Sequence, residues 1–199
     1  MQPDWARSDR TTRLLDNLAD DVNLLPIKHQ KIFAEILVVR LFLLIENSLA
    51  SIASKLLCGA PYLDHSTPRR LVYARSINHA RSMMQTHGRS TPLSNLSWTQ
   101  SKDIRNNLDA TLDRTDPFYT TILTYSDFLT ELRYVRNHIV HANDNSRKNF
   151  QKIVRKHFGG LKRGMTPGLL LLTHRLGPHP QLKKYIVSGR MLLRELVRR

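Results

Sequence analysis

The chain has 199 residues, and 41% of them are hydrophobic, which predicts one domain with a real core and excludes a disordered chain. Lys and Arg number 31 against 16 Asp and Glu, a formal net charge of +15, so we expect a polyanionic partner: nucleic acid, an anionic membrane surface or an acidic protein. A solvated basic surface is the alternative. The single Cys58 excludes an internal disulfide framework and a cysteine-rich zinc site.

Helical periodicity dominates the chain, and it predicts an all-α fold. A first helix is expected from about Ser8 to Val22. Pro26 opens a long helix at 27–57, which Gly59 terminates. Because this helix is apolar nearly all round, we expect it to be the central helix of the fold.

The most apolar stretch, residues 32–49, contains Glu35, Arg40 and Glu46. Charges at these positions predict a buried helix of a soluble protein rather than a membrane span. Residues 1–5 show no basic-then-apolar signal pattern. We therefore expect a cytoplasmic protein with no membrane partner.

The next helix is predicted at 68–86, with Ser66 or Thr67 as its cap and Pro68 in its first turn. Its exposed face is expected to carry Arg69, Arg70, Arg75 and Arg81. A loop at 87–95 and a polar helix at about 99–113 follow.

Asp116 is expected to cap another helix, with Pro117 at its first position. This helix is predicted to run unbroken over 118–142 and to end at 143–145, an Asn-Asp-Asn run.

A basic helix at 147–158 is predicted to stop at Gly159. The remaining chain shows an apolar run at 169–172, a turn at Gly177-Pro178 and a last helix to Arg199. The expected organisation is a helical domain over 1–160 and a helical extension over 161–199, packed on the same domain.

The predicted helix that ends near residue 142 carries the most informative pattern of the chain. Its apolar residues recur at helical spacing and form one arc: Leu129, Leu132, Val135, Ile139 and Val140. At roughly 100° per residue, Arg136 falls inside this arc, and Asn137 and His141 share the flank beside it. A buried arginine is costly unless it is paired or functional. A cation beside an amide and an imidazole is suited to bind and cleave a phosphodiester.

This Arg136-Asn137-x-x-x-His141 pattern, late in a helical chain, resembles the Arg-x4-His motif of the HEPN superfamily. Those domains often have a polar residue after the motif arginine, as Asn137 is here. Some branches have a tyrosine two residues past the histidine, where this chain has Asn143. A looser similarity, an apolar early helix with an embedded glutamate, covers about 27–158.

The resemblance implies a HEPN-like helical bundle with additional C-terminal helices. It implies a metal-independent endoribonuclease that works as a homodimer and leaves 2′,3′-cyclic phosphate ends. The expected role is a toxin or phage-defence effector, restrained by an antitoxin or another regulatory protein.

Four residues are candidates for the catalytic site. His141 can exchange protons near neutral pH, and Arg136 can hold a phosphate and stabilise charge on its oxygens. Asn137 is expected to orient His141 or a phosphate oxygen. Glu46, which resembles the buried acidic residue of some HEPN domains, is expected to accept from Arg136 or His141. The alternatives are structural: Arg136 paired with a buried carboxylate, His141 a helix-end histidine, and Glu46 paired with a basic residue such as Arg40.

The basic helix is the candidate RNA-binding surface, because its cations cover one broad face: Arg147, Lys148, Lys152, Arg155 and Lys156. No cofactor or metal is expected, since no ligand cluster or nucleotide fingerprint is present. Two other functions stay open: a catalytically silent HEPN module that binds a nucleotide or a partner, and a basic helical protein that binds nucleic acid without cleaving it.

Overall fold

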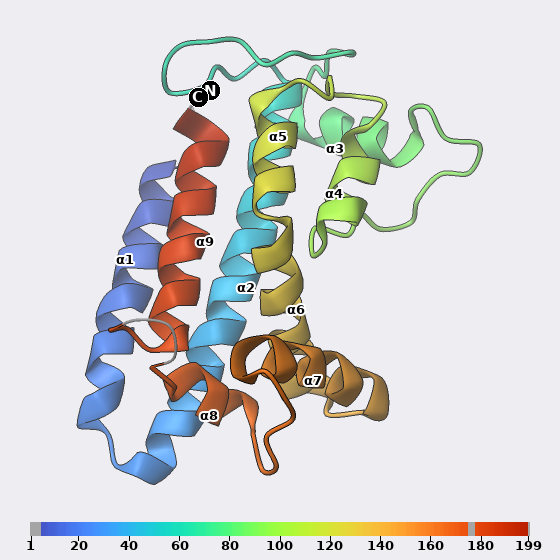
Figure 1. The fold of residues 1–199 in the computed structure, drawn as a ribbon. Coiled ribbons are helices and arrows are strands. Elements are labelled where there is room, and N and C mark those ends of the chain that lie inside the picture. Colours follow the sequence, from blue (N-terminus) through green and yellow to red (C-terminus); the bar gives the residue numbers. More distant parts are fainter. Residues whose placement is uncertain (1–4, 175–177, 199) are drawn as a thin grey trace. The chain divides into compact units, whose positions relative to one another are not determined.

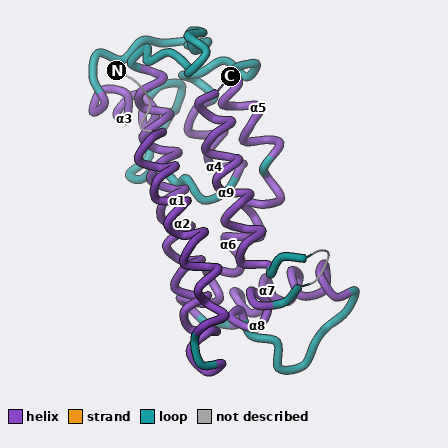
Figure 2. Tube along the Cα trace, turned by 90° about the vertical axis from the view of Figure 1, so that its left-hand side faces the viewer, coloured by secondary structure: helices purple, strands orange, loops and turns teal. Residues whose placement is uncertain are grey.

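The computed structural model of the chain describes residues 5–174 and 178–198. Within them every regular element is helical, which confirms the all-α prediction (Figures 1 and 2). The helices are α1 (Trp5–Asp21), α2 (Ile27–Leu57), α3 (Ile77–Thr86), α4 (Ser101–Leu108), α5 (Pro117–Thr124), α6 (Ser126–His141), α7 (Asp144–Phe158), α8 (Pro167–Leu172) and α9 (Gln181–Arg198), with a 3₁₀ turn at Val22–Leu24.

The described residues form two compact units. Unit 1 contains the residues up to Asp9, the segment Ile45–Leu129 and the chain from Met191 onward. Unit 2 contains Arg10–Leu44 and Thr130–Arg190. Both units draw on segments from before and after residue 160, and the expected division at that residue stays a prediction.

Helix α2 has the predicted bounds and supplies core residues to both units. Its residues Ala34, Val38 and Leu41 are fully buried in unit 2, and Leu49 and Leu56 are fully buried in unit 1.

By length and composition α2 could cross a membrane, with a mean hydropathy of 1.9 over its most apolar window. Half of that window is buried inside the protein, and a single helix of this kind is weak evidence for a membrane span.

The start of α5 in unit 1 follows the sequence prediction. Asp116 is completely buried, and its Oδ1 accepts a hydrogen bond from the backbone N of Phe118 at 2.9 Å. The same carboxylate accepts from the Tyr62 hydroxyl and from the backbone N of Arg69. Burial and the neighbouring Asp116 charge raise the pKa of Tyr62 well above its ordinary value. Asp116 therefore joins three segments of unit 1.

The predicted helix at 68–86 is wrong in its first half. Helix α3 begins at Ile77, and Ser76 caps it by accepting from the backbone N of His79. Residues 69–74 are instead held by distant backbone acceptors: Leu71 N donates to Thr111 O, and Ala74 N donates to Leu57 O. Because these bonds replace helical ones, Arg69, Arg70 and Arg75 lie in an irregular segment and do not form a helix face with Arg81.

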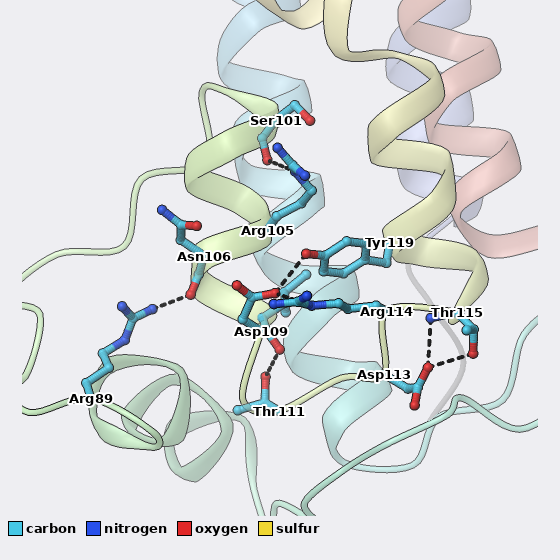
Figure 3. A network of polar contacts seen from close by, with 11 residues as sticks. Arg89, Ser101, Arg105, Asn106, Asp109, Thr111, Asp113, Arg114, Thr115 and Tyr119 are labelled. Carbon is cyan, nitrogen blue, oxygen red and sulfur yellow. Dashed lines mark hydrogen bonds and ion pairs between the residues drawn. The ribbon is translucent and has the colours of Figure 1, made fainter.

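Helix α4 is shorter than predicted and ends at Leu108. The next residue, Asp109, accepts hydrogen bonds from the Tyr119 hydroxyl at 2.8 Å and from Arg114 Nε at 3.2 Å (Figure 3). Tyr119 belongs to α5, so Asp109 fixes the end of α4 against that helix.

The predicted helix over 118–142 is also wrong in its continuity, because Tyr125 separates α5 from α6. The hydroxyls of Thr120 and Thr124 donate back to the carbonyls of Pro117 and Thr120. Such bonds to the preceding turn weaken and bend helices. The hydroxyl of Tyr125 donates to Glu195 on α9 at 3.0 Å.

Ion pairs and hydrogen bonds connect the helices of unit 2. Lys183 on α9 lies 2.5 Å from an oxygen of Asp20 on α1, and these bonds raise the pKa of Lys183. Glu35 on α2 accepts from the backbone N of Gly168 in α8 at 2.8 Å. An alanine at position 168 would place its Cβ 2.8 Å from the Cβ of Lys31, too close for an ordinary contact.

Helix α7 ends where the sequence predicts, but it begins at Asp144, before the predicted start at 147. Asn143 caps it by accepting from Ser146 N, and Gly159 ends it with a left-handed φ of 70°. Gly177 of the predicted turn and the last residue, Arg199, lie outside the described residues.

Candidate functional site

The apolar arc of α6 is buried over most of its length. Leu129, Leu132 and Val135 are at most 3% exposed, and Ile139 is half-buried. Val140 is 48% exposed, so its assignment to the buried arc was wrong. The core contact of α6 therefore stops before the last residues of the helix, where the motif lies.

Arg136 is half-buried at the edge of this arc. Its guanidinium carbon lies 5.1 Å from the centre of the Phe42 ring on α2, a cation–π contact within unit 2. Its Nη1 donates to Oδ1 of Asn137 at 3.0 Å and lies 3.5 Å from Nε2 of His141. Its Nε is buried without a partner. Among the described residues no carboxylate forms an ion pair with Arg136.

His141 is exposed at the C-terminal end of α6. A guanidinium can only donate, so Nε2 of His141 can take part in this contact only as an acceptor. The chain leaves the helix at Ala142, which has a φ of 45°. The imidazole of His141 therefore lies at an open surface beside a cation.

The structure brings Arg136, Asn137 and His141 together, and their catalytic roles stay predictions. The amide of Asn137 contacts Arg136 rather than His141, so in this geometry it orients the guanidinium. Glu46 is half-buried and belongs to unit 1. No hydrogen bond or ion pair of its carboxylate joins it to another described residue, and its predicted contact with Arg136 or His141 stays a prediction.

The five cations of the candidate RNA-binding surface are all exposed on α7. Arg147 is paired with Asp144, and Lys156 Nζ lies 2.7 Å from Glu131 Oε1. Lys152 donates to Asn149 at 3.0 Å and lies 5.8 Å from the ring centre of Tyr134. The remaining two cations, Lys148 and Arg155, point to solvent with no ion pair among the described residues.

Sequence reasoning missed Glu131, which lies on α6 and links it to α7 and α9. Its Oε2 accepts from Tyr185 at 3.2 Å and lies 3.3 Å from His157 Nε2, while Lys156 binds the other oxygen. Burial acts to raise the pKa of Glu131, but hydrogen bonds from His157 and Lys156 outweigh it and lower the pKa to about 2. No local pattern marks this residue, because its partners lie far along the chain.

His138, to which the sequence assigned no chemistry, has a packing role. Its ring stacks on Phe150 with centroids 4.9 Å apart, and its Nδ1 lies 3.3 Å from Ser146 Oγ. Burial lowers the pKa of His138, and the charge of Arg147 adds to this. The neutral ring therefore helps to hold α7 against the end of α6.

Within the described parts of the chain, no group of three His, Cys, Asp or Glu side chains is placed to hold a metal ion. Comparison with protein-family models, characterised proteins and solved structures finds no match for this chain.

Proposed function

We propose that the protein is a metal-independent endoribonuclease of the HEPN type. One observation carries the proposal: Arg136 is half-buried without a carboxylate partner, and its guanidinium lies 3.5 Å from the exposed imidazole of His141. A half-buried cation that no acid neutralises favours an anionic ligand. The Arg-x4-His pattern makes a phosphodiester the expected anion.

The chemistry follows from the two side chains. The neutral imidazole of His141 accepts the proton of the ribose 2′-hydroxyl, and the 2′-oxygen attacks the adjacent phosphorus. Arg136 donates to the non-bridging oxygens and stabilises the charge that builds on them. The bond to the 5′-oxygen breaks, and the products are a 2′,3′-cyclic phosphate and a 5′-hydroxyl.

The leaving 5′-oxygen needs a proton, and the His141 that accepted one from the 2′-hydroxyl is not placed to act on both sides of the phosphorus. In this proposal a second protomer supplies a second imidazole, which in its protonated form gives its proton to the 5′-oxygen, as the resemblance implies for a homodimer. The biological role that suits such an activity is a cytoplasmic toxin or phage-defence effector with an antitoxin or regulatory partner.

The exposed cations of α7 also favour a second candidate function, in which the protein binds RNA without cleaving it. Lys148, Lys152 and Arg155 give a surface able to follow phosphates. In this reading Arg136 and His141 hold a phosphate and perform no chemistry.

Incubation of the purified protein with labelled RNA separates these functions. The expected result is cleavage that EDTA leaves unchanged and that His141→Ala slows on the order of 10²-fold or more, with cyclic or 3′-phosphate ends. The matched control is His138→Asn, which alters a histidine of the same helix that packs on Phe150. Binding without cleavage favours the second function, and activity that EDTA removes and a divalent ion restores contradicts the two-residue mechanism.

A further inference from the structure

Unit 1 contains a groove of about 580 Å³ that the proposed ribonuclease chemistry does not use. Its wall is formed by the segment that enters α5, by α5 itself and by the C-terminal end of α9. Its polar lining comprises Arg69, Thr115, Thr120, Thr121, Glu195 and Arg198. This volume lies within the usual range of small-molecule sites.

Arg69 is held in a fixed position at this groove. Its backbone N donates to the buried Asp116 at 2.8 Å, and its carbonyl accepts from Asp113 N at 2.8 Å. Its Nη1 donates to the Thr115 hydroxyl at 2.8 Å. Figure 3 shows the Thr115 hydroxyl beside Asp113, to which it donates. A guanidinium has five N–H donors, so the Thr115 bond leaves most of them for a ligand.

The second cation, Arg198, lies on α9 and is exposed. No hydrogen bond or ion pair joins its side chain to another described residue, although Glu195 is three positions earlier on the same helix. Two guanidiniums that line one groove repel each other, and an anion between them removes this repulsion. Guanidinium groups bind phosphate oxygens through paired N–H donors.

Glu195 restricts which anions fit. The Tyr125 hydroxyl donates to its Oε1 at 3.0 Å, and the exposed carboxylate keeps further acceptor positions free. A carboxylate repels a bare phosphate but accepts a hydrogen bond from a hydroxyl. The combination favours a ligand that carries a phosphate at one end and hydroxyl donors at the other.

We propose that this groove binds a sugar phosphate monoester. The phosphate lies between Arg69 and Arg198, and a sugar hydroxyl donates to Glu195. The site is independent of Arg136 and His141, which belong to unit 2.

Isothermal titration of the full chain with ribose 5-phosphate tests the proposal, with inorganic phosphate and ribose as separate ligands. We expect ribose 5-phosphate to bind with a Kd of about 0.1–1 mM, and each of the other two about tenfold more weakly or not at all. Arg69→Gln and Arg198→Gln are each expected to lower the binding affinity for ribose 5-phosphate at least about tenfold. Glu195→Gln is expected to remove the preference over inorganic phosphate.

Arg75→Gln is the matched control, because Arg75 is an exposed arginine of unit 1 outside the groove. It is expected to bind as the wild type does. Equal weakening by Arg75→Gln would assign the binding to the overall charge and overturn the proposal. The proposal is also overturned if titration with ribose 5-phosphate at about 10 mM gives no heat of binding. It is overturned as well if neither Arg69→Gln nor Arg198→Gln changes the affinity for ribose 5-phosphate. If Arg69→Gln lowers the melting temperature, Arg198→Gln still tests the proposal, because Arg198 is exposed and its substitution is expected to leave the fold intact.

Discussion

Replacing Glu131 by Gln tests whether one carboxylate holds the helices of unit 2 together. Its side chain is 12% exposed and interacts with Lys156, His157 and Tyr185. The pKa of Glu131 falls from its ordinary 4.5 to about 2. At about 1.4 kcal/mol for each pKa unit, this shift corresponds to about 3 kcal/mol of folding free energy near neutral pH. The amide keeps the shape of the side chain and removes its charge.

The sign of the pH dependence follows from a pKa that folding lowers. The contribution of Glu131 is fully present above the pKa of the unfolded chain, and it is lost as the pH falls through the lower pKa of the folded protein. The pH window is therefore about 4.5 down to about 2. At pH 3 the difference in stability between the wild type and Glu131→Gln should shrink to about half of its value at pH 7.

Urea unfolding followed by circular dichroism, at pH 7 and at pH 3, measures both quantities. Asp144→Asn is the matched control, since its pair with Arg147 is exposed and such pairs contribute at most about 1 kcal/mol. If Glu131→Gln stays within about 1 kcal/mol of the wild type at pH 7, or loses the same stability at both pH values, the reasoning is refuted.

Three further predictions concern the proposed activity. Arg136→Ala and His141→Ala should each stay within about 1 kcal/mol of wild-type stability and still lose on the order of 10²-fold in single-turnover rate. Their double mutant should be little worse than either, and activity losses that follow unfolding would return both residues to a structural role. Charge reversal at Lys152 and Arg155 should lower the binding affinity for many RNAs to a similar extent, as measured by fluorescence anisotropy, because phosphate contacts do not read sequence. A change of cleavage site at unchanged affinity would contradict this. Light scattering at micromolar concentration should show a dimer, and an active strict monomer would exclude the shared site.

The local signals of the sequence predicted the helices whose ends are determined nearby. The bounds of α2 and the Asp116–Pro117 start of α5 were confirmed, as was the end of α7 at Gly159. In each case a proline, a capping side chain or a glycine acts within a few residues of the helix end.

The errors occurred where distant groups compete with local helix formation. The segment before Ile77 was predicted as helix, but its backbone donors bind Asp116, Thr111 O and Leu57 O. The break at Tyr125 depends on hydroxyl bonds to the backbone, which the apolar periodicity does not reveal.

At the candidate site, helical spacing correctly placed Arg136 beside Asn137 and His141, because residues one to five apart on a helix have nearly fixed separations. The same spacing could not reveal Glu131 as a link between helices. Its partners Lys156, His157 and Tyr185 meet it only after three helices have packed together.

The close approach of α8 to α2 has a consequence for how this sequence can vary. The Cβ of any larger residue at position 168 would lie 2.9 Å from the carbonyl oxygen of Lys31 and 3.0 Å from Oε1 of Glu35. Gly168 also donates its backbone N to that same carboxylate. Because this carbonyl oxygen belongs to the backbone, no change of side chain at 31 or 35 relieves the contact, and a larger residue at 168 requires α8 and α2 to move apart. In diverged descendants of this chain, glycine at 168 should therefore be retained.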